Sequence, residues 1–177
     1  MTKGKFTHEV LITKEELAAK VKELGRKITE DYKGESLLLV GILKGSVPFM
    51  ADLMREIDLD VTLEFMSVSS YGSATKSSGI VRIIKDLDVP IEGLNVLIVE
   101  DIIDTGLTLD YLKGYLMGRH PKSLKICSIL DKPSRRKVDI KGDYIGFEVE
   151  DKYIVGYGLD MDQHYRNLPY ISWIKEE

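Results

Sequence analysis

The residues best suited to chemistry stand together between positions 100 and 108, where an apolar run ends in two carboxylates and a short Asp-Thr-Gly loop follows. Gly106 allows a ligand to approach the backbone closely, and Thr105 and Thr108 place hydroxyl groups beside it. We expect a helix to begin near Leu107, so that its free N–H groups point into the same loop. Backbone N–H groups and hydroxyls arranged in this way can hold a phosphate.

Glu100 and Asp101, which come directly before this loop, would repel an anion unless they face a different group. Carboxylate oxygens accept hydrogen bonds from both hydroxyls of a ribose, and they bind or orient Mg²⁺, which prefers hard oxygen ligands. A ligand with a phosphate, a sugar diol and a metal-bound anion, such as phosphoribosyl pyrophosphate, suits all of these features. The alternative is that both carboxylates are solvated loop residues and that Asp104 only caps the helix.

Three apolar runs without polar alternation, at 36–42, 96–99 and 123–130, predict the elements that position these residues. Such runs are typical of strands that are buried on both faces of a parallel sheet, and helices must then cover both faces. The segment from Thr13 to Glu16 has the pattern of a capping box and begins a predicted amphipathic helix. We therefore predict an α/β fold, and the chain of 177 residues, 44% of them hydrophobic, is long enough for one domain over residues 1–177.

Charged groups follow each of the three predicted strands. Lys44-Gly45 comes after the first, the acidic pair after the second, and Asp131-Lys132 after the third. Open α/β sheets bind ligands at the carboxyl ends of their strands, so we expect these groups to share one site. Lys44 and the N–H of Gly45 are suited to an anion, although an ordinary solvated lysine is an equal alternative.

The segment Glu-Asp-Ile-Ile-Asp-Thr-Gly at 100–106 resembles the phosphoribosyl pyrophosphate motif of the type I phosphoribosyltransferases, and in this form that of the hypoxanthine-guanine phosphoribosyltransferase family. The resemblance extends from about Val10 to Trp173. It implies a central, mostly parallel, twisted sheet flanked by helices, with a flexible lid loop at about 69–80. A small hood would be formed by the N-terminal segment and residues 151–177.

The resemblance also implies a role for individual residues. The ribose and the 5′-phosphate would be bound by Glu100, Asp101, Asp104, Thr105, Gly106, Leu107 and Thr108. The pyrophosphate group would be bound by Lys44, Gly45 and Arg166, and a cis peptide bond would join Leu43 to Lys44. Mg²⁺, the implied cofactor, would be held by Glu100, Asp101 and Asp160.

The purine would be bound by Lys132, Tyr153, Ile154 and Asp160. Lys132 would donate to the six-position oxygen, which selects 6-oxopurines over adenine. Asp104 would remove the proton from N7 of the purine as a general base. Ser70 and Tyr71 would belong to the lid, which closes over the reacting centre and excludes water.

Other interpretations of these residues stand beside the resemblance. Without it, Tyr153 would be a packing aromatic, Arg166 a surface ion-pair partner and the segment 69–79 a disordered hairpin tip. Leu107 stands where some family members carry lysine, and Tyr153 where many carry phenylalanine, so phosphate affinity and base preference are expected to be tuned differently here. The first residues, including His8, are expected to be mobile, and the residues after Asp160 to form a polar tail.

The activity that the resemblance implies is Mg²⁺-dependent, reversible transfer of 5-phosphoribosyl to hypoxanthine or guanine, giving IMP or GMP and pyrophosphate in purine salvage. Alternatives are a regulator that senses phosphoribosyl pyrophosphate without catalysis, an enzyme that prefers xanthine, and a phosphoacceptor receiver domain.

A net charge of −4 argues against nucleic acid and anionic membrane as partners, and no run approaches the ~20 apolar residues of a membrane span. The single cysteine, Cys127, can form no internal disulfide and fits a cytoplasmic protein. We expect a homodimer or a homotetramer.

Overall fold

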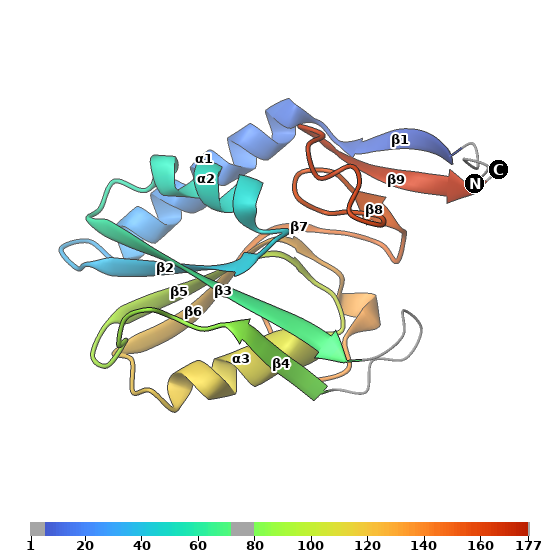
Figure 1. Cartoon of the computed structure of the whole chain (residues 1–177). Coiled ribbons are helices and arrows are strands. Elements are labelled where there is room, and N and C mark those ends of the chain that lie inside the picture. The colour runs from blue at the N-terminus through green and yellow to red at the C-terminus, as the bar shows by residue number, and fades with distance from the viewer. Residues whose placement is uncertain (1–5, 72–79, 177) are drawn as a thin grey trace.

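The computed structural model describes residues 6–71 and 80–176. Its core is a six-stranded sheet with the order β4-β3-β2-β5-β6-β7, in which β4 alone runs antiparallel to its neighbour (Figure 1). The predicted α/β fold with a mostly parallel sheet is therefore confirmed. The strands are β2 (Leu37–Leu43), β3 (Val61–Tyr71), β4 (Ile80–Lys85), β5 (Asn95–Ile103), β6 (Ser123–Asp131) and β7 (Tyr144–Glu148).

The three apolar runs of the sequence become the neighbouring strands β2, β5 and β6 at the centre of this sheet. Leu39 pairs with Leu97, and Ile98 pairs with Ile126, in parallel register. Along β2, alternate side chains enter opposite hydrophobic cores, as Leu39 and Val40 do, and for this reason the sequence shows no polar alternation there.

Helices cover both faces of the sheet. Helices α1 (Lys14–Asp31) and α2 (Val47–Glu56) pack on one face, and α3 (Leu107–Met117) packs on the other (Figure 1). The predicted capping box of α1 is present, since Glu16 N donates to Thr13 Oγ1 over 3.2 Å and Thr13 N donates to Glu16 Oε2 over 2.8 Å. Fully buried helix residues such as Leu53 and Leu112 fill the two cores, and each contributes roughly 1.5–3 kcal/mol of burial free energy.

A second, three-stranded sheet with the order β1-β9-β8 joins the N-terminal segment to residues 154–176, and we call it the hood. Its strands are β1 (Phe6–Ile12), β9 (Ile171–Glu176) and β8 (Ile154–Val155). Two expectations were wrong here, because residues 6–12 are a strand rather than a mobile start, and the polar tail ends in β9. Strands β1 and β9 pair with each other, Val10 opposite Ser172. Each strand is stabilised by a partner at the other end of the chain, which a local stretch of sequence does not reveal.

The expected lid is built on a hairpin of β3 and β4. Tyr71 pairs with Ile80 and Ser70 pairs with Val81, so both ends of the lid segment are paired strand. Residues 72–79 of the lid prediction lie outside the described residues. Within residues 6–71 and 80–176, no helix combines the length and the apolar character needed to cross a membrane.

Candidate active site

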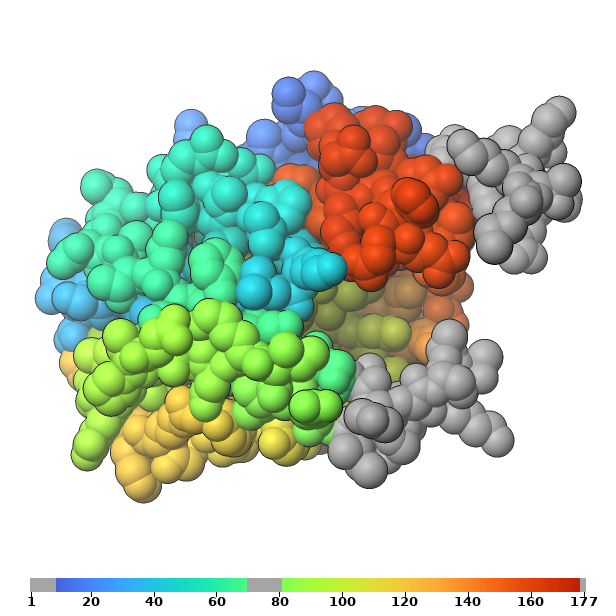
Figure 2. Space-filling model, viewed as in Figure 1, coloured from blue at the N-terminus to red at the C-terminus, as the bar shows by residue number. Residues whose placement is uncertain are grey.

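The carboxyl ends of β2, β5 and β6 lie side by side, between the hood and the β3–β4 hairpin (Figure 1). Figure 2 shows a recess there, with the red hood on one side, the green hairpin on the other and olive atoms of the β5 region at its floor. A cavity of about 240 Å³ lies at this edge. Its lining residues are Ile42, Leu43, Val68, Glu100, Ile102, Ile103, Asp104, Thr105, Gly106, Thr108 and Leu109.

The loop from Asp104 to Thr108 runs from β5 into α3 with the geometry of a phosphate-binding turn. Gly106 is the N-cap of α3 and has a φ of +82°, and no side chain caps the first N–H groups of the helix. A Cβ at this position would stand 2.6 Å from Ile140, so only glycine fits. Lys137 N donates to Thr105 O over 2.9 Å and fixes the loop. The unsatisfied N–H groups at this helix start can receive an anion.

Glu100 and Asp101 end the buried part of β5, and both are half-buried. Burial and the neighbouring charge of Asp101 raise the pKa of Glu100 well above its ordinary value. Burial also raises the pKa of Asp101, although hydrogen bonds to its carboxylate and the charge of Arg166 act in the opposite direction. Protein cations therefore do not fully neutralise the negative charge of the two carboxylates. Their oxygens can instead bind hydroxyl donors or a divalent cation.

The Lys44-Gly45 loop contacts both the acidic pair and the hood. The peptide bond between Leu43 and Lys44 is cis, as the resemblance implied. A Cβ on Gly45 would stand 1.6 Å from Asp101 Oδ2, and a Cβ on Gly158 would stand 1.8 Å from Gly45 O. Both contacts are closer than any side chain allows, so glycine at these positions lets the three segments meet.

Arg166 reaches the same loop from the hood. It donates from Nη1 to Gly158 O over 2.7 Å, and its Nη2 lies 2.7 Å from Asp160 Oδ1. Gln163 Oε1 accepts from Arg166 Nη2 and from Lys44 Nζ, at 3.3 Å in each case. Lys44 and Arg166, two of the three residues predicted to bind pyrophosphate, are therefore brought together. Sequence reasoning missed Gln163, because a lone amide in a loop carries no recognisable pattern.

On the side predicted to bind the purine, Lys132 is only 8% exposed. Its Nζ donates to Lys152 O over 2.9 Å and lies 3.7 Å from Asp151 Oδ1. Tyr153 is 57% exposed, and Ile154 is buried in β8. Lys132 thus bonds to the residue directly before Tyr153, so a buried ammonium group and an exposed aromatic ring belong to linked segments, a combination suited to a flat, polar ligand.

Asp104, the predicted base, has a partner that sequence reasoning did not find. Arg135 Nε donates to Asp104 Oδ1 over 3.1 Å, and Arg135 Nη1 lies 3.5 Å from Asp151 Oδ2. The two carboxylates raise the pKa of Arg135. The guanidinium group thus connects the loop after β5 with the segment that contacts Lys132.

The donor set fits Mg²⁺ only in part. Over residues 6–71 and 80–176, no three His, Cys, Asp or Glu side chains converge on one point, so Asp160 does not complete a three-carboxylate cage with Glu100 and Asp101. Asp160 pairs with Arg166 instead, and its metal role stays a prediction. Mg²⁺ keeps several waters and takes oxygens from phosphates, so two adjacent carboxylates are a sufficient protein contribution.

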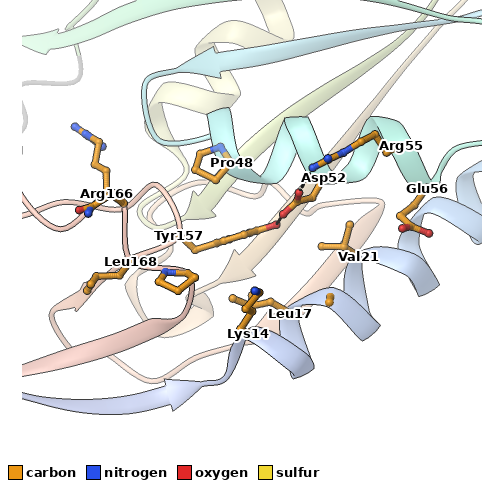
Figure 3. Close-up of a pocket in the computed structure, with 13 residues that line it drawn as sticks. Lys14, Leu17, Val21, Pro48, Asp52, Arg55, Glu56, Tyr157, Arg166 and Leu168 are labelled. Atoms are coloured by element: carbon orange, nitrogen blue, oxygen red, sulfur yellow. Dashed lines mark hydrogen bonds and ion pairs between the residues drawn. The ribbon is translucent and has the colours of Figure 1, made fainter.

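A larger pocket of about 540 Å³ lies between α1, α2 and residues 166–169 (Figure 3). Tyr157 points across it and donates to Asp52 Oδ2 over 2.8 Å. The Arg166 side chain starts at its edge and points away from Asp52. Of the side chains predicted to bind the nucleotide, only Arg166 lines this pocket. The hydrogen bond between Tyr157 and Asp52 anchors the hood to α2.

Comparison with known proteins agrees with this geometry. Residues 10–162 match the family model described as phosphoribosyl transferase domain. The chain is 56% identical to a hypoxanthine-guanine phosphoribosyltransferase of Bacillus subtilis over 94% of this chain and 93% of that protein. It is 51% identical to a protein of the same name from Streptococcus thermophilus, over 96% and 94% of the two chains.

Solved structures show the same likeness. A crystal structure of a hypoxanthine-guanine phosphoribosyltransferase from Bacillus anthracis superimposes with a TM-score of 0.91 at 50% identity, covering 98% of this chain and 100% of that one. A hypoxanthine phosphoribosyltransferase from Staphylococcus aureus gives a TM-score of 0.92 at 51% identity, over 94% and 91% of the two chains.

Proposed function

Because the chain belongs to the phosphoribosyl transferase domain family, we propose that it transfers 5-phosphoribosyl from phosphoribosyl pyrophosphate to hypoxanthine or guanine. The products are IMP or GMP and pyrophosphate, and the role is purine salvage. One observation carries the proposal. Three neighbouring strands end in an acidic pair, a phosphate-binding helix start, a Lys-Gly loop and a buried lysine, all at one edge of the sheet.

The two ends of the activated sugar meet different groups. Glu100 and Asp101 accept hydrogen bonds from the ribose hydroxyls, and the loop from Asp104 to Thr108 binds the 5′-phosphate at the start of α3. The sugar is then held at both ends while its C1′ develops positive charge. Fixing the reacting atoms in this way converts binding energy into rate.

The leaving group is bound on the other side of the acidic pair. Lys44, the N–H of Gly45 and Arg166 stabilise the negative charge of the departing pyrophosphate. Mg²⁺, when bound, neutralises part of that charge, and Glu100 and Asp101 are the residues that would hold or orient it. The carboxylate of Asp160 is paired with Arg166. We propose that it helps to position Mg²⁺ and the loop that contacts the purine.

Base recognition rests on Lys132 and the hood. The ammonium group of Lys132 donates to a six-position oxygen and has no acceptor for an amino group, so the site selects hypoxanthine and guanine over adenine. Tyr153 stacks on the purine, and the backbone of Ile154 contacts its edge. Asp104 removes the N7 proton as the bond between N9 and C1′ forms.

The lid and the surroundings of the protein complete the proposal. Ser70 and Tyr71, at the end of β3, lead into the segment that closes over the sugar. We propose that the protein acts in the cytoplasm as a homodimer or homotetramer. The single buried thiol of Cys127 suits a reducing compartment.

A nucleotide-formation assay tests the function. The protein is incubated with Mg²⁺, phosphoribosyl pyrophosphate and one of hypoxanthine, guanine, xanthine or adenine. We expect nucleotide from the first two and none from adenine. A faster reaction with xanthine would instead identify a xanthine-preferring enzyme. Binding of phosphoribosyl pyrophosphate without any nucleotide formation would favour the regulatory alternative.

A further inference from the structure

Gln163 has no role in the transfer reaction as proposed, although it contacts two of the residues assigned to pyrophosphate. Its Oε1 accepts hydrogen bonds from both Lys44 Nζ and Arg166 Nη2, each over 3.3 Å. Lys44 lies 119 residues away in the sequence, in the loop after β2. One neutral oxygen therefore stands between the two cations that the proposed function assigns to pyrophosphate.

The backbone of the loop that carries Gln163 is strongly constrained. Asp162, Gln163 and Tyr165 have φ values of 51°, 67° and 75°, which side chains rarely adopt. Gln163 N donates to Asp160 Oδ2 over 2.8 Å, and Met161 and His164 exchange backbone hydrogen bonds of 3.2 and 2.9 Å. Backbone strain of this kind persists where the surroundings fix the conformation. The amide oxygen is accordingly placed by the loop.

An amide oxygen is suited to a contact that a bound anion later replaces. A carbonyl oxygen has two lone pairs and can accept from an ammonium and a guanidinium group together. The bonds from Lys44 and Arg166 to the amide join a cation to a neutral oxygen, whereas bonds to a phosphate oxygen join opposite charges and are stronger, so an incoming anion displaces the amide. A carboxylate in the same place would keep the cations and repel the anion.

We propose that Gln163 is a positioning residue for the leaving group. Its amide oxygen holds Lys44 and Arg166 together in the free protein, where an oxygen of the pyrophosphate group later replaces it. The inference rests on the proposed function. It implies that Gln163 acts through binding of the diphosphate and not through the purine or the proton transfer.

Two substitutions test this role, with pyrophosphate and Mg²⁺ as the probe in isothermal titration calorimetry. In Gln163→Ala the cations are no longer held together, and the Kd for pyrophosphate should rise about threefold. In Gln163→Glu the carboxylate competes with the anion, and the Kd should rise about tenfold or more. The KM for phosphoribosyl pyrophosphate should follow the same order, while the KM for hypoxanthine stays unchanged.

Asn167→Asp provides the matched control, because it adds the same charge one residue beyond Arg166, on the side of the larger pocket. We expect wild-type affinity for pyrophosphate in this variant. If Gln163→Glu binds pyrophosphate as the wild type does, or if Gln163→Ala binds it more tightly, the positioning role is wrong. If the wild type neither binds pyrophosphate nor forms nucleotide, the proposed function itself fails.

Discussion

Arg135 Nε donates a hydrogen bond to Asp104 Oδ1 over 3.1 Å, so the carboxylate that we assign to proton transfer is already paired with a cation in the free protein. The second carboxylate oxygen of Asp104 has no such partner among the described residues. A purine N7–H can therefore approach that oxygen while the guanidinium group holds the first. The pair is nearly half exposed on both sides, which makes its contribution to stability small, about 0–1 kcal/mol.

Substitution of Arg135 should affect turnover more than folding. Solvent screens the charge of this exposed pair, so we expect Arg135 to act mainly by orienting the carboxylate of Asp104. We expect Arg135→Ala to lower kcat about 3- to 10-fold, with Arg135→Lys restoring part of it. The KM for phosphoribosyl pyrophosphate should not change. A higher kcat in Arg135→Ala would contradict the orienting role of Arg135.

Removing the carboxylate itself gives a larger effect. Asp104→Asn keeps the shape of the side chain but cannot accept a proton, and general-base assistance is typically worth about 10²–10⁴ in rate. We expect kcat to fall by that factor, while calorimetric binding of phosphoribosyl pyrophosphate stays close to the wild type. Asp110→Asn, on the exposed side of the first turn of α3, is the matched control and should have full activity. Unchanged turnover in Asp104→Asn would remove this residue from the base role.

The contact between Gly45 and Asp101 gives a test of the acidic pair. A Cβ on Gly45 would stand 1.6 Å from Asp101 Oδ2, so Gly45→Ala must displace the carboxylate or the loop. We expect at least a tenfold loss in kcat/KM for phosphoribosyl pyrophosphate, about 1.4 kcal/mol or more in transition-state binding.

Gly114→Ala is the control for that change, because Gly114 lies inside α3 with nothing within 4 Å of its Cβ position. This variant should keep its activity and gain about 0.5–1 kcal/mol in free energy of unfolding, since alanine favours helix. Equal activity of Gly45→Ala and wild type would show that the close contact has no part in substrate binding.

Much of the fold could be predicted because its signals are local. The runs that became β2, β5 and β6 are buried on both faces and so lack polar alternation, and the capping box of α1 lies within four residues. Strands β1 and β9 were missed because Val10 and Ser172 stabilise each other across the whole chain. No window of sequence contains both partners of that pair.

The same distinction holds for the candidate site. The segment 100–108 carries its chemistry in consecutive residues and was recognisable from sequence alone. Gln163 and Arg135 were not, because each matters only through a partner that folding brings near, Lys44 in one case and Asp104 in the other. An isolated amide or a guanidinium group in a basic loop has many possible partners before the sheet is assembled.

The half-buried carboxylates Glu100 and Asp101 should lower the free energy of unfolding of the metal-free protein at neutral pH. Burial and the charge of Asp101 raise the pKa of Glu100 well above its ordinary value, which it regains in the unfolded chain. Between these two pKa values the folded protein keeps a proton that the unfolded chain has lost, so the free energy of unfolding falls as the pH rises through this window. Glu100→Gln removes the titrating group together with its penalty.

We therefore expect Glu100→Gln to unfold at a higher urea concentration than the wild type at pH 7, in EDTA, and to lose this advantage below about pH 4, where a glutamate is protonated in both states. The exposed Glu92→Gln serves as the control and should match the wild type at both pH values. The same Glu100→Gln protein should bind phosphoribosyl pyrophosphate and Mg²⁺ less tightly, because an amide replaces a carboxylate acceptor. If the midpoint difference is the same at pH 4 and pH 7, the stabilisation comes from packing and the ionised pair carries no penalty.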